Sequence, residues 1–118
     1  MSAIVQGRVV WALLTSPDGK TTKRRPAVVL TPTEEIKDDE PFAVVAGSTR
    51  IDDPLPPNKV MLPWNREGTT KSRLRKPTVV VCDWLCSIRE QDVIQFGGVL
   101  SAKLMVEIAM RIDTAKTP

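Results

Sequence analysis

The chain has 118 residues, of which 42% are hydrophobic and 26% charged, and its formal net charge is +3 without any histidine. This length and apolar content predict a single globular domain, residues 1–118, that buries its own core. No apolar run reaches the roughly 18 residues of a membrane span, and the N-terminus lacks the pattern of a signal peptide, so we expect a cytoplasmic protein. The mildly basic charge favours a polyanionic partner.

Three strands are predicted in the first half of the chain. β-Branched and aromatic residues at 7–14 predict the first strand, and the Pro-Asp-Gly turn signal at 17–19 ends it. A cationic loop then leads into a second strand at 26–30, which ends at the Thr-Pro-Thr segment because proline cannot continue a ladder. The uninterrupted apolar run at 42–47 predicts a third strand that is buried on both faces.

The second half is predicted to contain two further strands separated by loops. Three prolines within 51–58 predict an extended connection, and a short strand is expected at 59–62. A polar and basic loop at 65–76 then leads into a core strand at 77–82.

A helix is predicted near the C-terminus. Apolar residues recur every four positions from Leu100 to Ile112, while charged residues form another stripe, and Ser101 is the expected cap. We expect the helix to pack on the sheet and residues 114–118 to be disordered. About five strands and one long helix indicate an α+β fold that is mainly β, a small barrel-like domain.

Cys82 and Cys86 are the only cysteines, and without histidine they cannot complete a four-ligand zinc site. On one continuous strand both sulfurs would point to the same face about 13 Å apart, too far to form a disulfide. We interpret both as reduced, buried packing thiols and expect no metal and no cofactor.

Cations precede the second strand, and hydroxyls follow the third. Arg24 and Arg25 lie before the second strand, and Ser48 and Thr49 lie just past the end of the third. A guanidinium offers a planar fork of donors that suits two phosphate oxygens, and a hydroxyl can bond a third oxygen. The two segments together therefore predict a phosphate-binding site.

Further basic residues gather in both loops that flank the sheet. Such sets are usually solvated loop faces, but two on one rim of a sheet can form a groove for single-stranded RNA. Trp64 is a candidate for stacking on an unpaired base, whereas Trp11 and Trp84 are interpreted as core or dimer-interface residues. The candidate RNA-binding cations are Lys20, Lys23, Arg24, Arg50, Arg66, Lys71 and Arg73, with Arg75 in the same loop.

An ordered set of short stretches resembles a known family. The stretches are Gly7-Arg8-Val9-Val10-Trp11, Arg25-Pro26-Ala27-Val28-Val29 and Ser48-Thr49-Arg50, followed by Gly97-Gly98-Val99-Leu100 before the helix. With this set the chain resembles the PemK/MazF family of endoribonuclease toxins from bacterial toxin-antitoxin pairs.

The resemblance implies a compact SH3-like barrel, usually a homodimer, that cleaves single-stranded RNA without metal or cofactor. It also implies a cognate antitoxin as partner, with which the toxin binds DNA. The family's catalytic arginine falls on Arg25, and its catalytic threonine falls on Ser48 by ungapped spacing or on Thr49 after a slip of one residue. The chain departs from the family at Arg8 and Arg50, where both changes add positive charge.

An RNase without histidine lacks the side chain best suited to acid-base chemistry near neutral pH. Arg25 would stabilise charge on the scissile phosphate while the RNA 2′-hydroxyl attacks it, and Ser48 or Thr49 would position a phosphate oxygen. Two alternatives stay open. One is a gyrase-inhibiting toxin of the same fold, and the other is a barrel that binds RNA or a peptide without catalysis.

Overall fold

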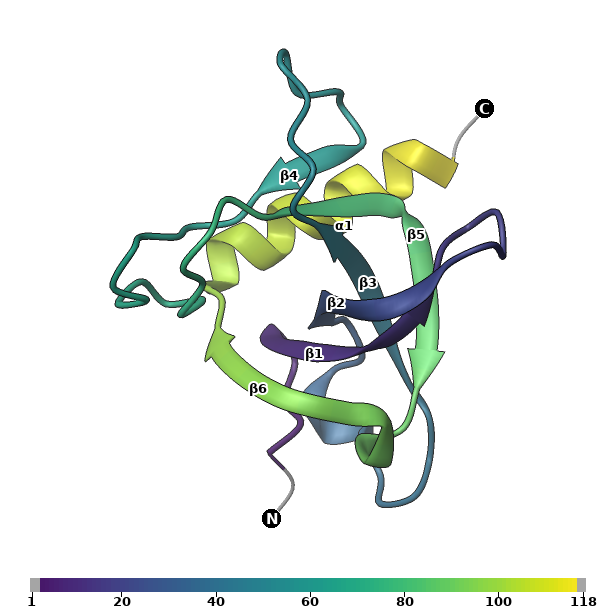
Figure 1. The fold of residues 1–118 in the computed structure, drawn as a ribbon. Coiled ribbons are helices and arrows are strands. Elements are labelled where there is room, and N and C mark those ends of the chain that lie inside the picture. Colours follow the sequence, from purple (N-terminus) through teal and green to yellow (C-terminus); the bar gives the residue numbers. More distant parts are fainter. Residues whose placement is uncertain (1–2, 117–118) are drawn as a thin grey trace.

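The structure is a computed structural model that describes residues 3–116. Its strands pair antiparallel throughout, in the spatial order β4-β5-β3-β2-β1-β6. The sheet curls around the core, and the C-terminal helix α1 lies against β5 (Figure 1). The fold is therefore mainly β with one C-terminal helix, as the sequence predicted. The elements are β1 (Arg8–Thr15), β2 (Thr22–Val29), β3 (Phe42–Ser48), β4 (Lys59–Met61), β5 (Val79–Ile88), β6 (Val93–Val99), α1 (Ala102–Lys116) and 3-10 turns at Thr33–Glu35 and Glu90–Asp92.

Both faces of the central strands are buried, because each face packs against its own hydrophobic cluster. Val45 of β3 belongs to the cluster that includes Ile108 of the helix. Its neighbours Val44 and Ala46 belong to a second cluster on the opposite face. Side chains alternate between the faces of a strand, so burial on both sides requires the uninterrupted apolar run seen in the sequence. The predicted burial of β3 is confirmed, with Ala43 as its exposed exception.

The second strand begins earlier than the sequence indicated. β2 starts at Thr22, so Arg24 and Arg25 lie inside the strand and not in a loop before it. These polar residues are extended because β1 pairs with them across the hairpin, which supplies their backbone partners regardless of side-chain type. Pro26 is tolerated within β2 because pairing with β3 begins only at Ala27. Ser48, expected just beyond the third strand, is the last residue of β3.

β6 was not recognised as a strand from its own pattern. Its pairing with β1 contains register shifts, and it ends near two consecutive glycines, which hide the usual period of two. β5 likewise continues to Ile88, beyond the predicted end at residue 82.

The two cysteines do not share a face as expected. A register shift between β3 and β5 separates them, so Cys82 is buried in the cluster with the helix and Cys86 is half-buried at the other cluster. Both are free thiols, and burial raises the pKa of each.

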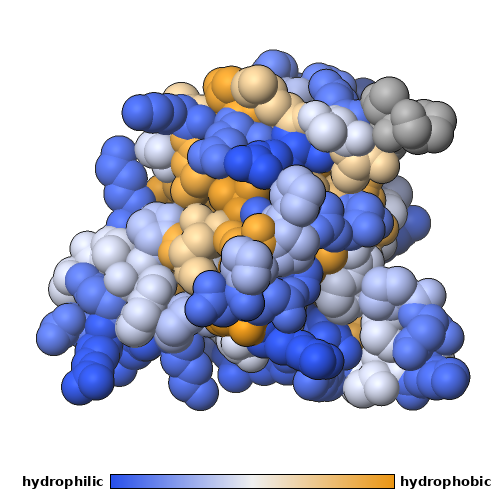
Figure 2. Space-filling model, turned by 90° about the horizontal axis from the view of Figure 1, so that it is seen from above, coloured by the Kyte–Doolittle hydropathy of each residue, from blue (hydrophilic) through white to orange (hydrophobic). Residues whose placement is uncertain are grey.

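The helix is capped as predicted, because the Leu104 amide donates to Ser101 Oγ at 3.2 Å. It continues through Lys116, so the disorder expected for residues 114–116 is wrong. Ile112 anchors this end of the helix in the core, while residues 117–118 lie outside the described part. Apolar residues also reach the surface among the hydrophilic ones (Figure 2), and Met110 of the helix is 64% exposed. None of the described helices is long and apolar enough to span a membrane.

Candidate functional site

A cavity of about 740 Å³ opens where β2 begins and β3 ends, with the loop after β4 as its far wall. Among the described residues, no aspartate, glutamate, histidine or cysteine lines it. A single-sign lining of this kind attracts an anion, since no acidic group competes for the cations. Its cationic residues are Lys23, Arg24, Arg25, Arg50, Arg73, Arg75 and Lys76.

Arg25 and Ser48 come together through the register of β2 and β3. Ala27 pairs with Ala46 in this antiparallel ladder. Continuing the register by two residues brings Arg25 opposite Ser48, and both line the cavity. The strands stay close at this point, since a Cβ added to Gly47 would lie 3.2 Å from the Pro26 carbonyl oxygen.

The Arg25 side chain is half-buried and held by two contacts. Its Cζ lies 5.0 Å from the ring centroid of Trp84, and its Nε donates to the Leu14 carbonyl oxygen at 3.4 Å. Neither of the ion pairs seen among the described residues, Lys59–Asp52 and Arg111–Glu107, involves a cavity cation. The aromatic ring therefore orients the guanidinium without neutralising its charge.

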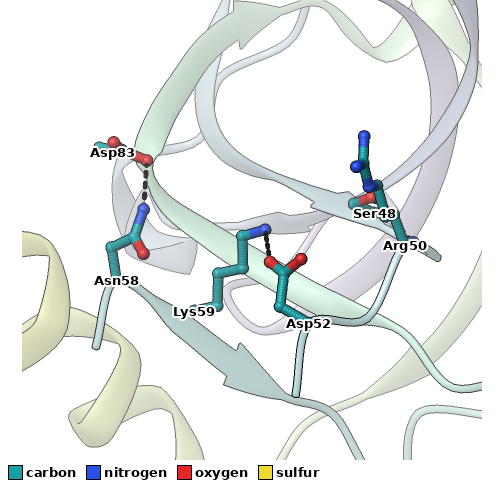
Figure 3. Close-up of polar contacts among 6 residues, drawn as sticks. All are labelled: Ser48, Arg50, Asp52, Asn58, Lys59 and Asp83. Atoms are coloured by element: carbon teal, nitrogen blue, oxygen red, sulfur yellow. Dashed lines mark hydrogen bonds and ion pairs between the residues drawn. The ribbon is translucent and has the colours of Figure 1, made fainter. Parts of the chain in front are cut away.

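Ser48 is half-buried, whereas Thr49 is exposed beyond the end of β3. The Arg50 amide donates to Ser48 Oγ at 3.0 Å, and Figure 3 shows the two residues side by side. Because Oγ acts as acceptor in this bond, the hydroxyl proton stays available for a ligand oxygen.

An ion pair anchors the segment that follows Arg50. Lys59 Nζ lies 2.6 Å from Asp52 Oδ2, and this hydrogen bond lowers the pKa of the Asp52 carboxyl (Figure 3). Nearby, Asn58 Nδ2 donates to Asp83 Oδ1 at 3.2 Å. These contacts tie the connection between β3 and β4 to the sheet.

Arg24 points to the other side of β2 from Arg25. Its Cζ lies 5.0 Å from the ring centroid of Trp11, and its Nη2 donates to Gln95 Oε1. Trp11 and Gln95 both line the cavity as well. Trp11, expected in the core or a dimer interface, is half-buried: it packs against the core cluster that includes Ile108 and also forms part of the cavity wall.

The structure brings together most of the predicted site residues but not all. Lys23, Arg24, Arg25, Ser48, Thr49, Arg50 and Arg73 line the cavity, whereas Lys20, Trp64, Arg66 and Lys71 do not. Sequence reasoning missed Lys76 and Gln95. The position of Lys76 at the end of a basic loop was a usable signal, while Gln95 lies in the strand whose pattern was obscured.

No group of three or more metal-ligating side chains occurs in the part of the chain that the structure describes. The cavity itself presents guanidinium and ammonium groups, which donate hydrogen bonds and repel cations. Its chemistry suits a phosphodiester or another anion.

A family model described as PemK-like, MazF-like toxin of type II toxin-antitoxin system matches residues 5–115. No relative was found among curated proteins.

Solved structures share the fold. A chain of a MazE–MazF crystal structure from Deinococcus radiodurans has a TM-score of 0.70 at 19% identity, covering 97% of this chain and 96% of that chain. The Mycobacterium tuberculosis toxin MazF-mt6 has a TM-score of 0.66 at 22% identity, covering 92% and 94%. A mycobacterial endoribonuclease in complex with its cognate antitoxin has a TM-score of 0.70 at 16% identity, covering 98% of each chain. Since the family model spans nearly the whole sequence, the chain belongs to the PemK-like, MazF-like toxins of type II toxin-antitoxin systems.

Proposed function

We propose that this protein is a metal-independent endoribonuclease that cleaves single-stranded RNA such as mRNA. One observation supports the proposal: Arg25 and the hydroxyl-bearing Ser48 line one cavity that holds seven cations and, among the described residues, no acidic side chain. Membership of a toxin family that includes MazF supports the same activity. The proposed partners are single-stranded RNA and a cognate antitoxin.

In the proposed reaction the RNA supplies its own nucleophile. The 2′-oxygen forms a bond to the adjacent phosphorus while the bond from phosphorus to the 5′-oxygen breaks, leaving a 2′,3′-cyclic phosphate and a 5′-hydroxyl. Arg25 binds non-bridging oxygens and stabilises the charge that develops on them. Cationic side chains thereby supply the charge stabilisation that a metal ion gives in other nucleases.

The proton of the 2′-hydroxyl leaves to solvent in this proposal. Arginine and lysine side chains stay protonated near neutral pH, and neither a carboxylate nor a histidine lines the cavity among the described residues. The departing 5′-oxygen takes its proton from water. Catalysis then depends on orientation and electrostatics rather than on a side-chain base.

We assign the positioning hydroxyl to Ser48 in preference to Thr49. Ser48 is half-buried and lies opposite Arg25 when the β2–β3 register is continued past its last pair, while Thr49 is exposed outside the strand. Its proton is available because the Arg50 amide uses the oxygen as acceptor. The Ser48→Ala variant should therefore cleave more slowly than the Thr49→Ala variant.

Three further cavity cations are proposed to hold flanking phosphates. Lys23, Arg50 and Arg73 line the same cavity as Arg25. Binding should weaken steeply with added salt, because each phosphate contact releases counterions. Lys20, Arg66, Lys71 and Trp64 lie outside the cavity, and only a longer RNA would reach them.

The proposed antitoxin contact is an acidic segment that covers this cavity, since it would mimic the charge of RNA. Competition between antitoxin and RNA tests this, and simultaneous binding contradicts it.

We also propose that the toxin forms a homodimer. The exposed apolar side chains of Leu13, Leu85 and Ile94, which are 62%, 42% and 54% accessible, support such an assembly.

Cleavage of a long single-stranded RNA in chelator tests the main proposal. Cyclic-phosphate ends are expected, and Arg25→Ala should slow cleavage by about 100-fold or more, as loss of one oxyanion donor does elsewhere. Lys103→Ala is the matched control, because it removes one cation from an exposed helix position outside the cavity. Cleavage by Arg25→Ala at the parental rate contradicts the assignment. Topoisomerase inhibition without RNA cleavage, or RNA binding without cleavage, would select the two alternatives.

A further inference from the structure

The two consecutive arginines of β2 occupy different environments within one cavity. In the β1–β2 register Arg24 pairs with Leu13 and Arg25 with Ala12, so their side chains leave opposite faces of the strand. Arg25 lies on the side of Trp84 and opposite Ser48. Arg24 lies on the side of Trp11 and Gln95. A nucleotide bound across β2 would therefore contact different protein groups on the two sides of the strand.

Arg24 is exposed and contacts two neutral partners. The indole of Trp11 covers one face of the guanidinium at 5.0 Å from its Cζ, and Gln95 Oε1 accepts a hydrogen bond from Nη2. A cation–π contact on its face leaves the donors along the edge of the guanidinium free to bond a ligand. Because these two contacts restrain the side chain, less conformational entropy is lost when a ligand binds.

Together, Arg24 and Gln95 present mainly donors to the cavity. Arginine has no acceptor, and the Gln95 carbonyl oxygen already accepts a hydrogen bond from Arg24, so the amide NH₂ group remains as the donor of Gln95. A neutral amide adds no charge for a phosphate to pair with, but it is a common reader of base edges. An acceptor-rich edge of a base would complement this pair.

We infer that Arg24 and Gln95 form the base-reading element of the cavity and select an unpaired guanine. Guanine presents two adjacent acceptors, O6 and N7, which match the donor geometry of arginine. Adenine carries an amino donor where guanine has O6, so the donors of Arg24 and Gln95 would find no acceptor at that position. The inference rests on the proposed function in so far as RNA is the ligand of this cavity.

Binding of short RNAs tests the inference separately from cleavage. Oligonucleotides with 2′-O-methyl groups cannot undergo attack by the 2′-oxygen, and each carries guanine, 7-deazaguanine or adenine at one position in a uridine background. The parent protein should bind the guanine oligonucleotide about tenfold or more tightly than the other two, the discrimination typical of a bidentate base contact. Fluorescence anisotropy measures the affinities.

Two variants and one control locate the preference. Arg24→Lys keeps the charge but loses the planar fork, and Gln95→Glu replaces the amide donor by an acceptor; both should abolish the preference for guanine. Lys23→Ala, which removes another cavity cation, should weaken binding to all three RNAs equally. Thermal melting of each variant near the parental temperature shows that the fold is retained.

The outcomes separate the two proposals. Equal affinity of the parent for all three RNAs, or a guanine preference that survives in Arg24→Lys, overturns the inference and leaves Arg24 as a phosphate ligand. A guanine preference in a protein that does not cut the matching 2′-hydroxyl RNA supports the inference and overturns the proposed catalysis. Absence of RNA binding overturns both.

Discussion

Replacing Gly98 by alanine should damage the wall of the cavity as well as the fold. Gly98 lies in β6, and its amide donates to the Ser72 carbonyl oxygen at 2.9 Å, which fastens the loop between β4 and β5 to the sheet. A Cβ added at Gly98 would lie 1.7 Å from the carbonyl oxygen of Lys71 and 2.8 Å from its carbonyl carbon. Both atoms belong to the backbone, so no side-chain rotation relieves the overlap.

The size of the effect follows from that overlap. Carbon and heavy-atom neighbours are at their optimum at about 3.5 Å, so the loop backbone must move by roughly 1.5 to 2 Å. Overpacking of this kind costs about 3 kcal/mol at the upper end of its usual range. For a domain of this length that loss lowers the melting temperature by roughly 12 °C. Because the displaced loop carries Arg73, Arg75 and Lys76, RNA affinity should fall too.

Thermal unfolding and RNA binding of Gly98→Ala measure both effects. Gly19→Ala is the control, because Gly19 has a φ of +74° but a Cβ there meets no atom within 4 Å. That variant should lose only about 1 kcal/mol from backbone strain and keep its RNA affinity. If Gly98→Ala melts no lower than Gly19→Ala and binds RNA normally, the close packing of β6 against the loop is refuted.

Four further predictions concern the helix cap, pH and the segment after β3. Ser101→Ala removes the cap bonded to the Leu104 amide and should cost about 1 kcal/mol in chemical denaturation; an unchanged midpoint contradicts the cap. The cleavage rate should rise steadily with pH without a bell shape, because neither a carboxylate nor a histidine lines the cavity among the described residues, and a maximum near neutrality would reveal a side-chain base. Lys59 lowers the pKa of Asp52 in the folded protein, so their bond stabilises the fold at pH values above the pKa that Asp52 has in the unfolded chain. This stability is lost as the pH falls through the lower pKa of the folded state. In melting curves recorded at different pH values, Asp52→Asn should remove this loss of stability at acidic pH. Burial raises the pKa of Cys82, so stability should fall above about pH 9 as the unfolded thiol ionises, and Cys82→Ala should flatten that slope.

Local patterns in the sequence were sufficient for much of the architecture. The apolar run of β3 predicted burial on two faces, and the fourfold spacing from Leu100 to Ile112 predicted the helix. These features depend on interactions between near neighbours and on hydrophobic period, which a sequence displays directly. The sequence pattern did not predict the polar start of β2 or the irregular strand β6, because these segments are extended through pairing with a neighbouring strand.

By itself the sequence indicated that cations and hydroxyls gather near the ends of two strands, and the resemblance selected Arg25 and Ser48 among them. Only the tertiary structure decided which loop cations reach the cavity, since Arg73 lines it while Lys71 does not. It also separated Arg24 from Arg25, because the register with β1 sends consecutive side chains to opposite faces. The physical reason is that a shared cavity depends on contacts between residues far apart in sequence, such as Arg24 with Gln95, which no local period encodes.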